Sequence, residues 1–314
     1  MKIAFFSNQI GLRGTEVALF DYAHYNEQIL GNESIICSYG RTVDETALNK
    51  FNNRFRKVHF INNLNSFVEE NKIDVFYKIC FGTKEDTPTN CKTVIHTVFG
   101  VFEPHGTVYS YVSKHLRDKM VPRNLIHQYD YVPHMINLPD VSEDLREDLN
   151  IPKNATVFGY YGGNDSFNID FVKKAIVKNI DKVSNIYFLF MNIDKFYNHK
   201  RILHLAGNSD LNYKCKFINS CNAMIHARQI GETFGIACGE FSSRGKPVIT
   251  CRFGNDLNHL DILKENAILY SNETEVEDII LNFEKYYNSS IDYNSYKDFA
   301  PDNVMKKFKE VYIN

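Results

Sequence analysis

The chain has 314 residues, of which 44% are apolar and 24% charged, a composition typical of a soluble globular protein with room for two domains. Its formal net charge of −2 argues against a nucleic-acid-binding protein that relies on bulk positive charge, so we expect no nucleic-acid partner. The seven cysteines are scattered without a Cys-x-x-Cys pair, no signal peptide is recognisable, and no apolar run approaches the ~18 residues of a membrane span, so we expect a cytoplasmic protein with reduced thiols.

Short apolar runs alternate with amphipathic stretches in the first part of the chain. Ile3–Ser7 predicts a buried strand, and a helix is predicted from Thr15 because Leu19, Tyr22 and Ala23 share one helical face. Further strands are predicted at Ser34–Ser38, Lys57–Ile61, Val75–Ile79, Thr93–His96 and Val108–Val112. The alternation of strands with helices indicates the α/β class, with a parallel sheet covered by helices on both faces.

A proline-containing segment at 132–155 interrupts this pattern, and we interpret it as a linker between domains. The pattern then restarts with a helix over Phe167–Val177 and with strands at Thr156–Tyr161, Ile186–Met191, Arg201–Ala206, Ala223–Ala227, Pro247–Cys251 and Ala267–Tyr270. We therefore predict two Rossmann-like domains, at residues 1–137 and 138–295. Residues 296–314 should include an amphipathic helix that packs back on one of them, with Val304, Phe308, Val311 and Tyr312 on its apolar face.

The stretch "GETFGIACGE" places two glutamates, Glu232 and Glu240, eight positions apart. The apolar run before it predicts a strand, and a helix is predicted from Gly235, so the loop should deliver a helix start to the carboxyl edge of a sheet, where open α/β folds bind ligands. Free amides in the first turn, together with the helix dipole, predict an anion site there. Glu240 should lie roughly 7–8 Å along the helix axis, and Glu232 just before the helix.

Two carboxylates on either side of an anion site suit a nucleotide sugar, because this ligand carries hydroxyl groups on both sides of its diphosphate. In this interpretation Glu240 accepts hydrogen bonds from the ribose, and Glu232 accepts them from the transferred sugar. Taken alone, however, two glutamates at this spacing are more often surface residues of an ordinary helix.

The surrounding residues favour the functional interpretation. "HARQIGETFGIACGEFSSRGKPVI" resembles the signature of the family 4 retaining glycosyltransferases, whose type B architecture has two facing Rossmann-like domains with the active site in the cleft between them. The matching positions are Glu232, Phe234, Gly235, Glu240, Gly245, Pro247 and Val248. "GLRGTE", which contains Gly14, is similar to the first glycine-rich loop of that family, and "TVIHTVFG" resembles its stretch with a histidine at the cleft, here His96.

The resemblance implies a set of site residues. His96 and Glu232 would be catalytic, with His96 contacting the sugar from the first domain and Glu232 positioning it. The donor would be bound by Gly14, Gly163, Asn164, Arg228, Thr233, Phe234, Gly235, Ile236 and Glu240. Without the resemblance, a histidine at a strand end is more often structural, and we interpret His226 as structural, although its closeness to Arg228 gives it a claim to the site.

One position departs from the family pattern. The family usually carries an arginine just after the glycine of the first strand of the second domain, and a lysine about six residues later, both of which contact the diphosphate. The corresponding segment here, "GGNDSFN" at 162–168, has neither. Arg228 is the nearest candidate for a compensating cation, ahead of Lys246 and Arg244, and an inactive enzyme or a purely structural role of Arg228 are the alternatives.

The reaction that the resemblance implies is the transfer of a hexose, with retention of configuration, from a nucleotide sugar to a hydroxyl of a glycan, glycoprotein or lipid-linked acceptor. No cofactor or metal is expected beyond this co-substrate, for which GDP-mannose is the first choice on family frequency alone. Peripheral membrane contact, through the basic segment "YVSKHLRDKMVPR", and oligomerisation stay open. The alternatives are a non-catalytic nucleotide-sugar-binding protein and a sugar-nucleotide epimerase of the same architecture.

Overall fold

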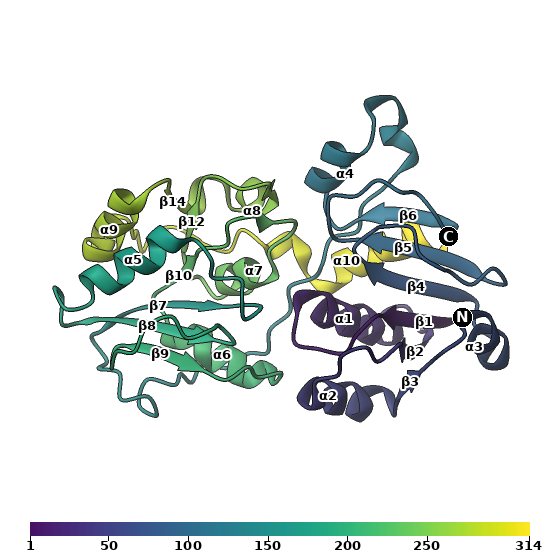
Figure 1. Cartoon of the computed structure of the whole chain (residues 1–314), viewed down its shortest axis with the longest axis horizontal. Helices are drawn as coiled ribbons and strands as arrows, with labels where there is room; N and C mark the ends of the chain where they lie inside the picture. The colour runs from purple at the N-terminus through teal and green to yellow at the C-terminus, as the bar shows by residue number, and fades with distance from the viewer. The chain divides into compact units, whose positions relative to one another are not determined.

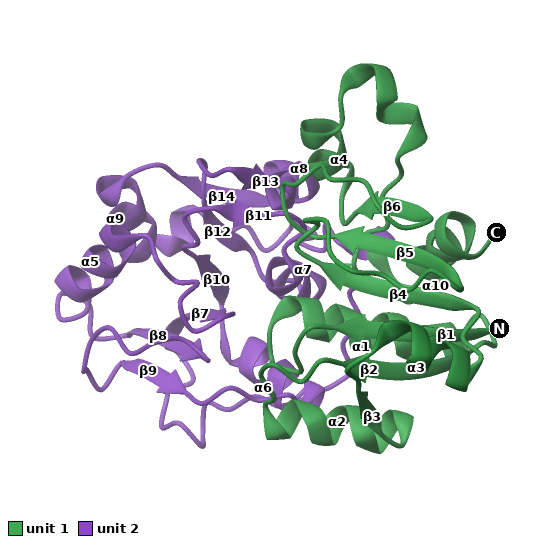
Figure 2. Cartoon of the chain, turned by 45° about the vertical axis from the view of Figure 1, so that its right-hand side comes forward, with its two compact units in different colours: residues 1–135, 299–314 green, residues 136–298 purple.

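The computed structural model describes residues 1–314, which divide into two compact units. Unit 1 comprises Met1–Met135 and Phe299–Asn314, and unit 2 comprises Ile136–Asp298 (Figure 2). The first unit thus ends two residues before the predicted boundary at 137, and the C-terminal segment belongs to unit 1. No helix of either unit has the length and the apolar character needed to cross a bilayer.

Unit 1 contains one six-stranded parallel sheet with the order β3-β2-β1-β4-β5-β6 (Figure 1). Its strands are β1 (Lys2–Ser7), β2 (Glu33–Ser38), β3 (Val58–Phe60), β4 (Val75–Cys80), β5 (Lys92–Thr97) and β6 (Val108–Tyr111). Its helices are α1 (Gly14–Gln28), α2 (Glu45–Phe55), α3 (Leu64–Asn71), α4 (Lys114–Met120), the 3₁₀ helix η1 (Arg123–Gln128) and the C-terminal α10 (Pro301–Phe308). This is the strand order of the doubly wound dinucleotide-binding folds.

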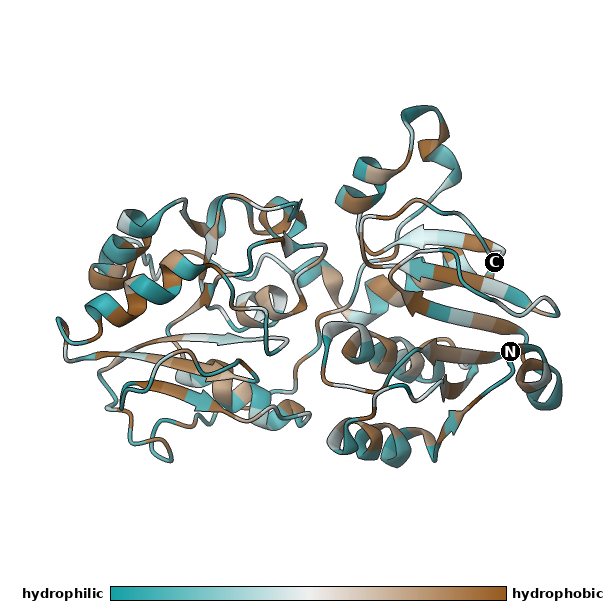
Figure 3. Ribbon diagram, in the orientation of Figure 1, coloured by the Kyte–Doolittle hydropathy of each residue, from teal (hydrophilic) through white to brown (hydrophobic).

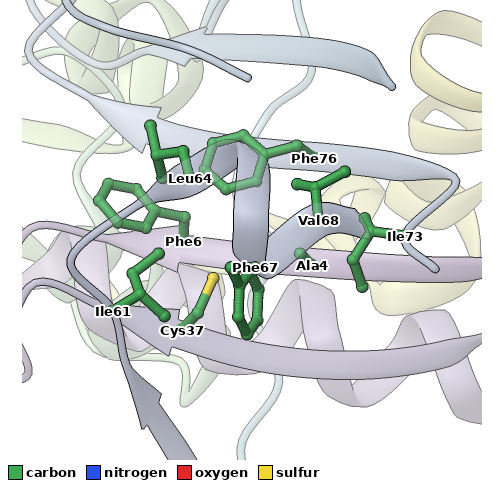
Figure 4. Packing of buried hydrophobic residues seen from close by; sticks show 9 residues of the cluster. All are labelled: Ala4, Phe6, Cys37, Ile61, Leu64, Phe67, Val68, Ile73 and Phe76. Carbon is green, nitrogen blue, oxygen red and sulfur yellow. The ribbon is translucent and has the colours of Figure 1, made fainter. Parts of the chain in front are cut away.

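Alternate residues of the central strands face opposite sides of this sheet. One side packs against α3, through a cluster made of Ala4, Phe6, Cys37, Ile61, Leu64, Phe67, Val68, Ile73 and Phe76 (Figure 4). The intervening residues Phe5 and Tyr77 face the other side, where their ring centroids lie 6.3 and 5.4 Å from that of Phe308 in α10. Figure 3 shows the apolar residues concentrated in the strands and on parts of the helices in both units.

The C-terminal segment completes the core of unit 1. Val304, Phe308 and Tyr312 are buried as the amphipathic pattern predicted, whereas Val311 is only partly buried because the chain passes into a π-helical turn, η5 (Lys309–Ile313), after α10. The hydroxyl groups of Tyr312 and Ser110 lie 2.5 Å apart, and Lys307 forms an ion pair of 3.0 Å with Asp130. Residues 299–314 therefore fold as part of unit 1 although they follow unit 2 in the chain.

Unit 2 repeats the architecture with a second six-stranded parallel sheet in the order β14-β12-β10-β7-β8-β9. Its strands are β7 (Thr156–Tyr161), β8 (Ile186–Met191), β9 (Ile202–Leu205), β10 (Ala223–His226), β12 (Val248–Cys251) and β14 (Ala267–Tyr270), and β11 (Gly231–Glu232) pairs separately with β13 (Asp256–Leu257). Its helices are α5 (Asp170–Asn179), α6 (Leu211–Ser220), α7 (Ile236–Ser243), α8 (Asn258–Leu263) and α9 (Glu273–Leu281), with the 3₁₀ turns η2 (Lys264–Asn266) and η3 (Phe283–Lys285), while η4 (Lys297–Phe299) lies where the chain leaves the unit.

Two segments of unit 2 differ from the sequence-based expectations. The helix predicted from Phe167 begins at Asp170, because the backbone amides of Asn168 and Ile169 donate to the carbonyl of Ala227 and hold this segment against the loop after β10. The segment 132–155, interpreted as a linker, contains the boundary between the units but is packed on both sides of it: the amide of Val132 donates to the carbonyl of Tyr111 in unit 1 at 2.8 Å, and Arg146 donates to the carbonyl of Ser220 in unit 2 at 2.9 Å.

Candidate functional site

In unit 2, the chain continues from β7 to β8 on one side of the sheet and from β10 to β12 on the other side. β7 pairs with β8 on one side and with β10 on the other, and β10 leads on to β12 on the far side. The loops after β7 and β10 therefore diverge at the carboxyl edge of the sheet, and a crevice at such a point is the usual ligand site of open α/β folds. The predicted donor-binding residues other than Gly14 lie on these two loops and on α7, which follows β10.

Glycines shape the loop after β10. Gly231 has a φ of +74°, and a Cβ atom at this position would lie 2.0 Å from the carbonyl oxygen of Asp256, because β11 and β13 pair closely here. Gly235, with a φ of +85°, precedes α7 and provides no side-chain cap for it. Since glycine adopts such angles without strain, the loop can turn sharply into the helix and leave the first amides of α7 available to an anion.

Phe234 anchors this loop in the core of unit 2. Its ring is buried 5.6 Å from that of Tyr296, and its carbonyl oxygen accepts a hydrogen bond of 3.0 Å from the hydroxyl of Tyr296. The flanking residues Thr233 and Ile236 are partly exposed. The contacts with Tyr296 thus fix the backbone at the start of α7, while Thr233 and Ile236 remain partly exposed.

Glu232 is the centre of a hydrogen-bonded cluster. Arg228 Nη1 donates to its Oε2 at 2.6 Å, and His226 Nε2 lies 3.2 Å from its Oε1. Burial raises the pKa of Glu232, but the charge of Arg228 and the contact with His226 outweigh burial and bring this pKa down to about 2. Glu232 is therefore a carboxylate at neutral pH, and with side-chain exposures of 16% for Glu232 and 28% for Arg228 the pair remains partly accessible.

Two further side chains lie behind His226. Its Nδ1 atom is 2.8 Å from the hydroxyl of Thr250, which is 3.0 Å from Nε2 of His259. His226 and Thr250 are register partners on β10 and β12, and all three side chains are buried. Burial, with a further contribution from His226, lowers the pKa of His259 to about 3, so this ring is neutral at physiological pH.

Glu240 occupies the predicted place in α7, as the fifth residue from Ile236, but it is 4% exposed and engaged by the protein itself. Lys214 Nζ on α6 donates to its Oε1 at 2.8 Å, and the hydroxyl of Tyr161, at the end of β7, donates to its Oε2. A ribose hydroxyl would therefore have to share Glu240 with these two partners.

The loop after β7 is held by the residues that follow β8. Asn192 Nδ2 donates to the carbonyl oxygen of Gly162 at 2.7 Å, and the backbone amide of Asp194 donates to the carbonyl oxygen of Asn164 at 2.9 Å. Gly163 is partly buried, and Asn164 is exposed. Burial lowers the pKa of Arg228, but the charge of Glu232 outweighs burial and raises this pKa, and Asp165 of this loop adds a smaller contribution in the same direction. The loop therefore brings a negative charge where the family pattern has positive ones.

The two remaining predicted residues belong to unit 1. Gly14 begins α1, directly after the loop that follows β1. His96 is 0% exposed, its Nδ1 atom is 2.7 Å from the hydroxyl of Tyr77, and the rings of Tyr22, His134 and Tyr312 surround it. Burial lowers its pKa to about 3. His96 is thus a core residue of unit 1, and the predicted contact with a sugar would require this core to open.

Sequence reasoning missed Lys214, Thr250 and His259, and it assigned His226 a structural role. Lys214 and Thr250 lie on other elements than the stretch that carries Glu232, and no spacing within that stretch predicts their contacts. For Thr250 the parallel sheet was a signal, because a polar residue near the end of one predicted strand should meet a polar residue near the end of the next, whereas Lys214 and His259 lie on helices and had no such signal.

Comparisons with known proteins show the fold. No protein-family model matches the chain, and no curated protein matches it. Among solved structures, HepE from Anabaena in complex with UDP and glucose has a TM-score of 0.74 at 12% identity, covering 99% of this chain and 98% of its own. A glycosyltransferase from Rickettsia africae ESF-5 has a TM-score of 0.71 at 14% identity, covering 99% of this chain and 97% of its own. WaaG, a glycosyltransferase involved in lipopolysaccharide biosynthesis, has a TM-score of 0.66 at 11% identity, covering 99% of this chain and 100% of its own. The predicted fold class, with two Rossmann-like domains of the glycosyltransferase type B, is confirmed.

Proposed function

We propose that this chain is a glycosyltransferase that moves a hexose from a nucleotide sugar to a hydroxyl of a glycan, glycoprotein or lipid-linked acceptor. The observation that carries the proposal is the cluster at the carboxyl edge of the second sheet. There a partly accessible carboxylate, Glu232, lies beside a cation, Arg228, immediately before a helix that is preceded by a glycine. This arrangement combines acceptors for sugar hydroxyls with donors for a diphosphate.

The diphosphate would be bound mainly by the start of α7. The first amides of this helix and its dipole favour an anion, and Gly235, with its φ of +85°, gives the backbone the turn that leads into the helix. Arg228 uses Nη1 for Glu232, and a guanidinium has further N–H groups with which it can reach a phosphate. It would thereby take the role that the family gives to the arginine and lysine absent from the loop after β7.

The reaction we propose retains the configuration of the sugar, in line with the family 4 resemblance. The bond between the anomeric carbon and the phosphate oxygen breaks, the acceptor oxygen bonds to the same face of that carbon, and the acceptor proton passes to the leaving diphosphate. The protein would contribute by stabilising the charge that grows on the leaving group, through Arg228 and the amides of α7, while Glu232 orients the hexose. No metal ion is part of this proposal.

The donor is the open part of the proposal. GDP-mannose is the choice that family frequency suggests, whereas HepE, a structural neighbour, has been solved in complex with UDP-glucose. Titration calorimetry with both donors and with UDP and GDP tests the proposal directly. We expect one nucleotide sugar to bind more tightly than its bare nucleotide and to be hydrolysed slowly in the absence of an acceptor.

Glu232→Gln should separate catalysis from binding, because it keeps the shape of the side chain and removes its charge. We expect turnover to fall about tenfold to a hundredfold, the range for losing a hydrogen bond to a charged group, while the bare nucleotide still binds. Lys178→Met is the matched control, because Lys178 forms an exposed ion pair of 2.6 Å with Glu277 in the same unit.

Three results would replace this proposal. Tight binding without turnover across varied acceptors would favour the non-catalytic binding protein, which the missing arginine and lysine first suggested. Interconversion of free sugar nucleotides would favour the epimerase. Failure of every donor and nucleotide to bind would remove the nucleotide-sugar site altogether.

A further inference from the structure

Four side chains of unit 2 form one continuous row of hydrogen-bonding groups that ends on Glu232. Glu232 Oε1 lies 3.2 Å from His226 Nε2, His226 Nδ1 lies 2.8 Å from Thr250 Oγ1, and Thr250 Oγ1 lies 3.0 Å from His259 Nε2. The three inner members are buried and come from β10, β12 and α8. Because water does not reach these three side chains, they must donate to and accept from one another.

The carboxylate fixes the direction of these hydrogen bonds. Glu232 is ionised and can only accept, so His226 Nε2 must carry a proton and donate to it. A neutral His226 then has a bare Nδ1, which accepts from the hydroxyl of Thr250. Since that hydroxyl has a single proton, its oxygen must accept from His259 Nε2. In this arrangement every hydrogen bond in the row points toward Glu232.

The opposite direction satisfies fewer groups. It requires a doubly protonated His226 that donates to Thr250, whose hydroxyl then donates to His259 Nε2, so that the proton of His259 moves to Nδ1. This Nδ1 atom is buried without a hydrogen bond of good geometry, although the backbone of Glu232 interacts with the ring of His259, so the charge of a doubly protonated His226 is the stronger argument. A buried N–H without an acceptor costs more than a bare nitrogen there, and a cationic His226 would add a second positive charge beside Arg228.

We propose that Thr250 and His259 are positioning residues for Glu232, on which they act by holding the imidazole of His226 from its Nδ1 side. This inference rests on the proposed function, because it assigns Glu232 the task of orienting the donor sugar. With Nε2–H of His226 fixed on Oε1 and Arg228 fixed on Oε2, the carboxylate cannot rotate, and its remaining lone pairs point in constant directions toward the sugar hydroxyls.

The surroundings of His226 keep this geometry rigid. The hydroxyl of Tyr270 donates to the backbone carbonyl of His226 at 2.7 Å, and the rings of Tyr160 and His259 lie 5.9 and 5.0 Å from the imidazole. These contacts and the hydrogen bonds at both ring nitrogens hold the imidazole in one orientation, in which Glu232 fixes the tautomer and the hydroxyl of Thr250 fixes the position of Nδ1.

The test compares Thr250→Val, which keeps the shape of the side chain and removes the hydroxyl, with Thr250→Ser, which restores the hydroxyl. Ser242→Ala is the matched control, because Ser242 also has a buried hydroxyl in unit 2, which donates at 2.6 Å to the carbonyl of Tyr293, outside this row. Nitrogen NMR of histidine-labelled full-length protein reports which ring nitrogen of His226 is protonated, and donor hydrolysis reports kcat and KM.

We expect the wild type, Thr250→Ser and Thr250→Val all to show His226 protonated at Nε2, because Glu232 is unchanged, and the resonance of the bare Nδ1 to shift only in Thr250→Val, where this nitrogen loses its hydrogen bond. We also expect Thr250→Val to lower kcat about threefold to tenfold with an unchanged KM for the donor, because a lost orienting hydrogen bond acts in the transition state. Ser242→Ala should leave both unchanged.

The inference is overturned if wild-type His226 carries its proton on Nδ1, if Thr250→Val leaves the Nδ1 resonance of His226 unchanged, or if kcat falls no more than in Ser242→Ala. The nitrogen spectra do not depend on turnover. A chain that hydrolyses no donor but shows the expected tautomers would refute the proposed function and leave the hydrogen-bonded row established.

Discussion

Replacing Lys214 by methionine should destabilise unit 2 far more than the same replacement at Lys178, although both lysines form close ion pairs. The Lys214–Glu240 pair has an N–O distance of 2.8 Å with side chains 10% and 5% exposed, whereas the Lys178–Glu277 pair has a distance of 2.6 Å with side chains 55% and 16% exposed. Burial is therefore the main difference between them.

The magnitude follows from the charge that the replacement leaves behind. Without Lys214 the carboxylate of Glu240 keeps only the hydroxyl of Tyr161 as a partner, and breaking a buried pair in this way costs about 3–5 kcal/mol. This is a large part of the ~5–15 kcal/mol that holds a typical domain together. Lys178 is solvent-exposed, so Lys178→Met should change stability little.

Hydrogen exchange of the full-length protein in increasing urea is the suitable assay, because peptides of unit 2 report the unfolding of this unit separately from unit 1. The double variant Lys214→Met/Glu240→Gln should recover part of the loss, since a neutral amide leaves no buried charge. The reasoning is refuted if Lys214→Met is no more destabilising than Lys178→Met, or if the double variant is as unstable as the single one.

Three other predictions address the remaining parts of the molecule. Because burial lowers the pKa of His96 to about 3 from its usual 6.5, the unfolded chain binds more protons below pH 6.5, and His96 should contribute about 2 kcal/mol to the loss of stability of unit 1 between pH 7 and 5, in addition to His134, whose pKa burial also lowers. Urea titrations at the two pH values measure this loss, which His96→Phe should reduce. Phe308→Ala should cost unit 1 about 3–5 kcal/mol and expose peptides of α1 and β4 to hydrogen exchange, whereas Phe253→Ala, at a side chain 62% exposed, should not. Asp165→Asn should tighten UDP or GDP binding roughly twofold to fivefold in low salt, because it removes a negative charge near Arg228, and calorimetry at two ionic strengths would contradict this if the affinity were unchanged.

The fold was predictable because buried parallel strands appear in a sequence as short continuous apolar runs. The strands predicted at Ile186–Met191 and Ala267–Tyr270 have the same bounds in the structure. Helix starts were less predictable, as Phe167 shows. Its place before α5 depends on hydrogen bonds to Ala227, about sixty residues further along the chain, and no local pattern contains that contact.

Only those residues of the candidate site that lie within one continuous stretch of sequence were predictable. Arg228 and Glu232 are four positions apart, so the sequence that suggested one also suggested the other. Thr250 comes to His226 through the register of β10 and β12, and Lys214 comes to Glu240 through the packing of α6 and α7 on the same sheet. These contacts are set by the sheet topology. When the strand order is not known, the partner of a lysine on a helix or of a threonine in a strand cannot be predicted.

The partners of Glu232 and Glu240 change the charge balance of the site. Each glutamate of the recognised stretch already has a cation, Arg228 for Glu232 and Lys214 for Glu240, so both pairs are close to neutral before any ligand binds. The loop after β7 adds the negative Asp165 in place of the positive residues of the family pattern. Within unit 2, a diphosphate at this edge would therefore depend on the amides and the dipole of α7, and on the N–H groups of Arg228 that Glu232 leaves free.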